Sequence, residues 1–251
     1  MKMQPAVASL ALACTLVSGC SSLNSSARVA AQQNEAALQR QQASESVVAP
    51  VNKRMHLDFI RQMQGRGLYF ASLAHLDAYE QAHGPAADTQ RLRADALRGT
   101  EQTAAADAAY RKLLNTAEAA AAWHGLGLLA GGAGDYAASV GAFREAAKRE
   151  PTNAIMLSDL SYALLRTGDF AAARVSIAQA AELAPDNRKI LGNLALFLLV
   201  SGAREKAHAV MEQARLPASL RSAVQQLADE IGAQASGIAC TAGTANSCIP
   251  L

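Results

Sequence analysis

Apolar and small residues recur at a fixed interval over much of the chain. Four series step by 34 residues: Leu126, Leu160 and Leu194; Gly134, Gly168 and Gly202; Phe143, Ile177 and Met211; Ala146, Ala180 and Ala214. The glycines are placed to end one helix before the next begins, and Pro151 and Pro185 follow the second helix of a unit. This period, in an alanine-rich chain with few aromatic residues, predicts stacked helix–turn–helix units.

The interval resembles that of the tetratricopeptide repeat (TPR), whose units are about 34 residues long. A small residue in each first helix (Gly127, Ser161 and Ala195) lets the second helix pack closely, and the large residue of the second helix fills the space between repeats. We predict an all-α fold, a TPR superhelix: an α-solenoid of about five helix–turn–helix repeats plus a C-terminal capping helix. The expected elements are the repeats 53–86, 87–120, 120–153, 154–187 and 188–221, and the capping helix 222–236.

The first two expected repeats fit the pattern less closely than the other three. The register slips by one residue between the second and the third repeat, and Gly99 is the residue expected near the turn of the second. Terminal repeats of a solenoid are often atypical, so the first repeat is expected to act as a cap.

The N-terminus has the features of an export signal. Lys2 precedes an apolar run from Ala6 to Val17, which is shorter than the roughly 20 residues that span a bilayer. The sequence Val17-Ser18-Gly19-Cys20 is similar to the lipobox of bacterial lipoproteins. That resemblance implies removal of a signal peptide, residues 1–19, and acylation of Cys20. Ser21, in place of the aspartate that tends to retain such proteins in the inner membrane, implies the periplasmic face of the outer membrane.

Two further segments lie outside the expected repeats. Residues 20–52 are rich in Ser, Ala and Gln, and we expect a lipid-anchored flexible tether there, with a marginal helix as the alternative. Residues 237–251 form a tail with Cys240 and Cys248. Because the periplasm is oxidising, we expect an intramolecular disulfide between these two cysteines, and an intermolecular bridge to a partner is the alternative.

The TPR template also predicts which residues face the concave groove. In the N-terminal half these are Arg54, Arg61, Arg91, Asp95 and Arg98, and in the C-terminal half Leu128, Ile155, Ser158, Tyr162, Leu165, Leu196 and Leu199. An apolar stretch that includes a tyrosine suits an amphipathic helix or an extended peptide of a partner protein. The alternative is that the capping helix or the tail covers some of these leucines. Only Lys189 and Asn193 resemble the carboxylate clamp of chaperone-binding TPRs.

Charge and motifs give no support for catalysis or nucleic-acid binding. The net charge is +2, and no Lys/Arg-rich patch with interleaved aromatics occurs. Gly125, Gly127 and Ala130 match G-x-G-x-x-A, but the pattern lies inside an expected helix, where the glycines are interpreted as packing residues. We therefore expect a protein that is not an enzyme and that has no cofactor, metal or small-molecule substrate.

A lipobox followed by about five TPRs in roughly 250 residues resembles the TadD lipoproteins of the tight-adherence (Flp pilus) assembly system. Two segments lean toward this family: Arg91–Arg98, and Ala105–Lys112 that follows it. The resemblance implies a scaffold in pilus assembly that binds proteins of the pilus or secretion machinery, with a pilotin-like role for an outer-membrane secretin. The alternatives are a pilotin of type IV pili or type II secretion, and an envelope scaffold that binds peptidoglycan hydrolases.

The lipobox generates the first prediction. Cys20→Ala removes the acylation site, and because each buried CH₂ of an acyl chain contributes about 0.8 kcal/mol, we expect the variant to leave the membrane fraction. Fractionation of envelopes with a carbonate wash measures this. A variant that stays in the washed membranes would contradict lipid anchoring at Cys20.

Overall fold

The structure is a computed structural model that describes residue 35 and residues 53–242, without the side chains of 235–242. The chain divides into two compact units, Met1–Asp58 and Phe59–Leu251. In the first unit, Glu35 and residues 53–58 are helical. The expected signal peptide, Cys20, the rest of the expected tether, the Cys240 side chain and Cys248 lie outside the described residues.

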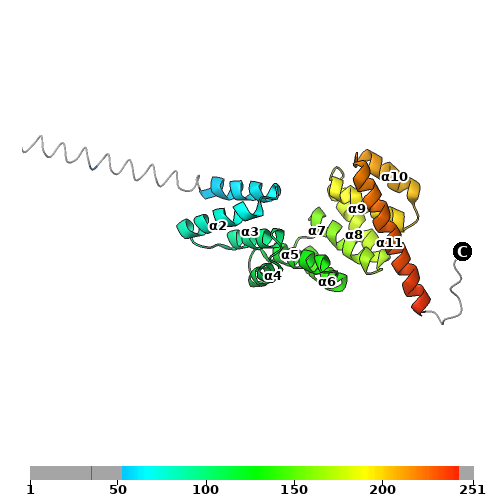
Figure 1. The fold of residues 1–251 in the computed structure, drawn as a ribbon, viewed down its shortest axis with the longest axis horizontal. Helices are drawn as coiled ribbons and strands as arrows, with labels where there is room; N and C mark the ends of the chain where they lie inside the picture. The colour runs from blue at the N-terminus through cyan, green and yellow to red at the C-terminus, as the bar shows by residue number, and fades with distance from the viewer. Residues whose placement is uncertain (1–34, 36–52, 243–251) are drawn as a thin grey trace, which may run out of the picture. The chain divides into compact units, whose positions relative to one another are not determined.

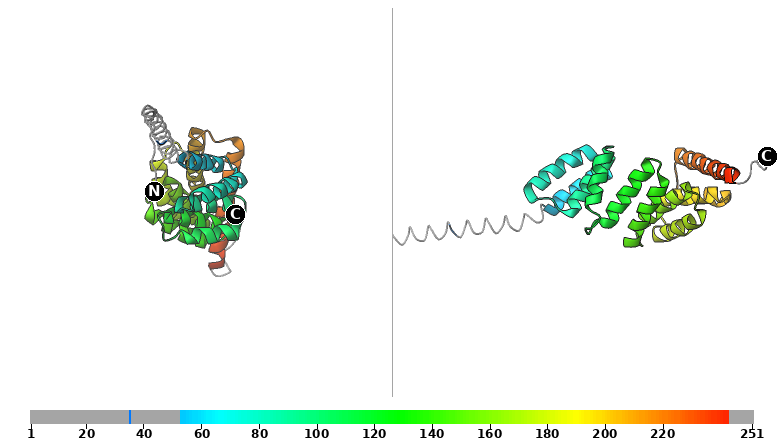
Figure 2. Two further views of the ribbon diagram at one scale, coloured as in Figure 1. Left: turned by 90° about the vertical axis from the view of Figure 1, so that its left-hand side faces the viewer. Right: turned by 90° about the horizontal axis from the view of Figure 1, so that it is seen from below.

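The second unit is a series of helical hairpins (Figures 1 and 2). In this unit, residues 59–65 are helical and precede the labelled elements. These are α2 (Tyr69–His83), α3 (Ala87–Gly99), α4 (Thr103–Lys112), α5 (Ala119–Gly132), α6 (Tyr136–Arg149), α7 (Ala154–Arg166), α8 (Phe170–Leu183), α9 (Arg188–Val200), α10 (Arg204–Gln213) and α11 (Ala218–Ala242). All regular structure in the described residues is helical, and none of the described helices is long and apolar enough to cross a membrane.

Helices pack in the order in which they follow one another along the chain. The hairpins α5–α6, α7–α8 and α9–α10 pair internally, and α6 on α7 and α8 on α9 join one hairpin to the next. One hydrophobic cluster runs through these elements, from Val140 in α6 to Ile231 in α11. This arrangement confirms the predicted all-α solenoid of helix–turn–helix repeats.

The turns between paired helices follow the glycine series. Gly134, Gly168 and Gly202 have φ values of 81°, 79° and 78°, a conformation that side chains disfavour, and each follows the end of a first helix. At Gly134 and Gly168 the next residue caps the second helix: the side chain of Asp135 accepts a hydrogen bond from the Ala138 amide at 2.9 Å, and Asp169 makes the same contact with Ala172. The Gly-Asp pairs therefore stop one helix and start the next.

The second repeat departs from the expected turn. Gly99 is the last residue of α3, where a Cβ atom would meet the Tyr69 ring, so it is a packing residue and not the turn. Glu101 holds the turn position instead, with φ of 61°. It is 34 residues after Gly67 and 33 before Gly134, both of which have positive φ, so the one-residue slip in register falls after this turn.

The G-x-G-x-x-A pattern lies within α5, and the element before it is the helix α4. A Cβ atom at Gly127 would lie 2.5 Å from Cδ1 of Phe143 in α6, and one at Gly125 would overlap the Tyr110 ring of α4. Both rings are buried. The two glycines therefore allow α5 to approach its neighbours, which is the packing role that the sequence predicts.

These contacts predict opposite effects for two Gly→Ala substitutions. Gly127→Ala should lower the free energy of unfolding by about 1–3 kcal/mol, because the buried Phe143 ring must move. Gly141→Ala, in α6 with nothing within 4 Å of its Cβ position, should raise it by about 0.5–1 kcal/mol. Urea unfolding followed by circular dichroism measures both. Equal effects of the two substitutions would contradict the packing role of Gly127.

Candidate protein-binding surface

Side chains from successive first helices meet across the repeats. Asp159 of α7 lies between His124 of α5 and Lys189 of α9: His124 Nε2 is 2.9 Å from Asp159 Oδ2, and Lys189 Nζ is 2.7 Å from Asp159 Oδ1. In the same way Asn193 Nδ2 donates to Ser158 Oγ at 2.9 Å. The first helices α5, α7 and α9 therefore form one continuous surface that polar contacts hold together.

Asp159 is the centre of this arrangement and is only 6% exposed. Burial raises the pKa of its carboxyl group, but the hydrogen bonds from His124 and Lys189 and the charge of Lys189 outweigh burial, so the pKa lies below its ordinary value. Because an ionised carboxylate only accepts hydrogen bonds, Nε2 of His124 carries the proton that points to Asp159. Asp159 thus acts as an internal anion that links three repeats.

The two residues that resemble a carboxylate clamp take part in these internal contacts. Lys189 binds Asp159, and Asn193 binds Ser158. A carboxylate of the chain itself therefore lies where a clamp would hold the C-terminal carboxylate of a ligand. This disfavours recognition of chaperone-like C-termini at these positions.

The predicted apolar groove residues fall into two groups. Leu128, Ile155 and Tyr162 are partly buried and remain open to a partner. Ser158, Leu165, Leu196 and Leu199 are buried, with Leu165 only 1% and Leu196 only 2% exposed. These four side chains are not available for binding in the structure, so the accessible apolar surface is narrower than the sequence predicts.

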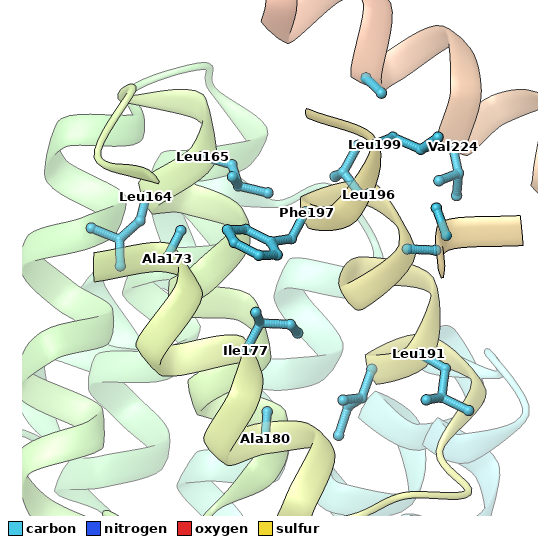
Figure 3. Close-up of a cluster of buried hydrophobic side chains, with 14 of the residues drawn as sticks. Leu164, Leu165, Ala173, Ile177, Ala180, Leu191, Leu196, Phe197, Leu199 and Val224 are labelled. Atoms are coloured by element: carbon cyan, nitrogen blue, oxygen red, sulfur yellow. The ribbon is translucent and has the colours of Figure 1, made fainter. Parts of the chain in front are cut away.

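The helix α11 explains why the last repeat contributes so little open surface. It packs against α9, and Figure 3 shows Val224 of α11 beside Leu196 and Leu199. All three belong to the main hydrophobic cluster. The alternative expected from the sequence, that a capping helix covers some groove leucines, is the arrangement that the structure contains.

The predicted basic half of the groove is partly neutralised by neighbouring acidic groups. Arg91 pairs with Asp95 at 2.6 Å and with Glu118, just before α5, at 2.8 Å. Arg98 Nε donates to the hydroxyl of buried Tyr110 at 3.3 Å, and that hydroxyl donates to Asp95 Oδ1 at 2.7 Å. Burial and the Asp95 charge raise the pKa of Tyr110, so its hydroxyl stays protonated and can donate.

The remaining predicted arginines lie further toward the N-terminus. Arg61 is exposed, and Asp88 of α3 lies 3.8 Å from it. Arg54 is exposed and belongs to the first unit. The groove arginines of the second unit are therefore close to carboxylates and do not form a bare cationic surface.

A second concave surface lies between α4, α5 and α6. It is a cleft of about 800 Å³ whose walls are formed by Thr103, Ala104, Asp107, Arg111, Trp123, Leu126, Leu129, Ala130, Ala138, Gly141 and Ala142. The indole Nε1 of Trp123 is buried without a hydrogen-bond partner. Small side chains on α6 (Ala138, Gly141 and Ala142) leave the space open.

No group of three or more His, Cys, Asp or Glu residues in the described part of the chain is placed to hold a metal ion.

Sequence reasoning did not identify Asp159 or Arg166 as parts of this surface. Asp159 lies 35 residues after His124 and 30 before Lys189, so each spacing is within about one helical turn of the 34-residue repeat, and this spacing of polar residues is the signal in the sequence that marks the contact. No comparable spacing marks Arg166, which stacks on Tyr136 of the preceding repeat.

The family comparisons agree with this geometry. Residues 124–188 and 164–231 match two tetratricopeptide repeat family models. The TPR repeat-containing protein PA4299 of Pseudomonas aeruginosa is 37% identical over 114 residues, which are 45% of this chain and 45% of that protein. The aligned part therefore spans less than half of the relative.

Solved structures show the same fold. A thermophilic TPR protein of Thermus thermophilus superposes with a TM-score of 0.56 at 19% identity, covering 70% of this chain and 98% of that one. MamA of Desulfovibrio magneticus RS-1 gives a TM-score of 0.50 at 13% identity, covering 68% of this chain and 95% or more of its own. The chain therefore has the fold of a TPR solenoid, with tetratricopeptide repeats recognised over residues 124–231, and such repeats typically serve as scaffolds that bind other proteins.

The Asp159 contacts generate a prediction on stability. Asp159→Asn should lower the free energy of unfolding at pH 7 by about 1–3 kcal/mol, because it removes the charge that Lys189 and His124 contact. The folded-state pKa of Asp159 is lowered, so its stabilisation is present above the unfolded-state pKa of about 3.9 and is lost as pH falls through the folded-state value. Urea unfolding at pH 7, 5 and 3 should therefore show a difference between the two proteins that shrinks below about pH 4.

Asp107→Asn is the matched control. Asp107 pairs with Arg111 on the exposed surface of α4, where such a pair contributes roughly 0–1 kcal/mol. Two results for Asp159→Asn would contradict the prediction: a loss of unfolding free energy as small as that of the control, or the same loss at pH 3 and pH 7. Either result would show that Asp159 does not link the repeats electrostatically.

Proposed function

We propose that the protein is a lipid-anchored scaffold on the periplasmic face of the outer membrane that holds proteins of the Flp (tight-adherence) pilus assembly machinery. Its TPR solenoid binds these proteins through the surface of the first helices. A secretin is the partner that the family resemblance favours, in a pilotin-like role. The lipobox at 17–20 supports the anchor.

The observation that carries the proposal is the preformed surface on α5 and α7. Leu128, Ile155 and Tyr162 are partly buried on helices that Asp159 fixes relative to one another. Apolar and tyrosine side chains on a rigid support suit a partner segment, because little conformational freedom is lost when they bind. The surface open to this segment excludes Leu196 and Leu199, which α11 covers.

Affinity purification from crosslinked envelopes, followed by mass spectrometry, tests the proposal. We expect the tagged lipoprotein to recover a secretin. The double variant Leu128→Lys, Ile155→Lys should reduce recovery at least tenfold, which corresponds to about 1.4 kcal/mol of binding free energy. Thermal unfolding followed by circular dichroism confirms that the variant is folded.

Val175→Lys is the matched control, because Val175 is an exposed apolar residue on the second helix α8 and should not affect recovery. Recovery of peptidoglycan hydrolases without a secretin would overturn the pilus proposal in favour of an envelope scaffold. Full recovery of the secretin by the double variant would place its binding site elsewhere, with the cleft between α4 and α6 as the next surface to test.

A further inference from the structure

Three side chains form a stack where α6 begins and α7 ends. The guanidinium carbon of Arg166 lies 4.2 Å from the centre of the Tyr136 ring and 6.0 Å from that of Tyr162. Arg166 Nη1 also donates to the Tyr162 hydroxyl at 3.0 Å. The two rings are nearly perpendicular to each other, with centres 6.1 Å apart. Tyr162 and Arg166 lie on the first helix α7 and Tyr162 is one of the predicted groove residues, whereas Tyr136 lies on the second helix α6, so the stack is at the edge of the first-helix surface.

Arg166 differs in its contacts from four other cations on the first helices, namely Arg91, Arg93, Arg98 and Lys189. Arg91, Arg93 and Lys189 each lie within 2.9 Å of a carboxylate, and Arg98 hydrogen-bonds to a tyrosine that binds Asp95. Among the described residues, the hydrogen bond and the ring contacts of the Arg166 guanidinium are with the two tyrosines. Its Nε is buried without a hydrogen-bond partner. A partly buried guanidinium without an anion has lost hydration that no ion pair replaces.

We propose that Arg166, held between Tyr136 and Tyr162, anchors an acidic side chain of an extended segment of a partner protein. This inference rests on the proposed function that the first-helix surface holds proteins. An incoming Asp or Glu gains a strong ion pair because much of the desolvation of Arg166 has already occurred. The tyrosines keep the guanidinium in a fixed plane, so little side-chain freedom is lost on binding, and arginine and tyrosine are the residues that dominate many protein interfaces.

The ligand chemistry is an acidic side chain within a peptide and not a C-terminal carboxylate. Lys189 and Asn193, the residues that resemble a clamp for C-termini, are engaged with Asp159 and Ser158. Arg166 lies at the other end of α7 from Ile155. A partner segment that contacts both Ile155 and Arg166 therefore needs an apolar residue and an acidic residue that are separated by about the length of α7.

Selection of peptides on the protein tests this inference. The full chain, purified from membranes in detergent, is used to select from a phage library of random 12-residue peptides, and the selected peptides are synthesised without a free C-terminal carboxylate. We expect them to share one Asp or Glu position. Arg166→Gln should weaken their binding at least tenfold, and Arg166→Lys, which keeps the charge but not the planar donor geometry, should weaken it less. Arg174→Gln, which removes an exposed positive charge from the second helix α8, should leave it unchanged.

A double-mutant cycle keeps the test independent of folding defects in the variants. Replacing the shared acidic residue of the peptide with its amide should weaken binding to the unmodified protein about tenfold and should have little further effect on Arg166→Gln. Selected peptides without a shared acidic position, an absence of selected peptides, or equal binding by Arg166→Gln would each overturn the inference. The proposed function is tested separately, because secretin recovery from crosslinked envelopes does not depend on these peptides.

Discussion

The structure depends on one constraint, which is that a two-helix hairpin cannot cover its own apolar face. Each hairpin of this chain leaves large side chains, such as Phe143 and Ile177, that the next hairpin must cover, and the hydrophobic cluster is consequently continuous from α6 to α11. The period of the sequence is a direct result, because the same space must be filled at each junction. Small residues such as Gly127 are as necessary as the large ones, since they set the distance between helices.

The same constraint shapes the surface that is available for binding. Core packing is carried by the faces between hairpins, so the outward positions of the first helices are free to carry polar contacts. Asp159 at such a position connects three first helices through His124 and Lys189. The ion pair and hydrogen bonds that lower the pKa of Asp159 also hold those helices in register. A partner therefore meets a surface whose parts are already in place, which limits the entropy lost on binding.

The sequence predicted the repeating elements and the helix that follows them, and it missed one turn and several contacts that do not repeat. The turns at Gly134, Gly168 and Gly202 follow from a residue type that a positive-φ backbone favours. The turn at Glu101 does not, because a glutamate with positive φ leaves no signal in the sequence and the nearby Gly99 suggests the wrong residue. Leu196 and Leu199 occupy groove positions of the template, and α11 covers them. The sequence predicted a capping helix at 222–236 but left open whether that helix covers these leucines. The Arg166 stack joins different template positions of two repeats, so no single periodic series contains it.

The position of α11 has a consequence for how such a chain can change over generations. The helix α11 covers the last hairpin, α9–α10. The earlier hairpins α5–α6 and α7–α8 are each covered by the next hairpin of the series. Duplication or loss of one 34-residue unit upstream would lengthen or shorten the binding surface. The last hairpin would still be covered by α11, because the contact between that hairpin and α11 would not change. Unequal recombination could therefore change the length of the solenoid in steps of one whole unit, and no new capping helix would have to evolve.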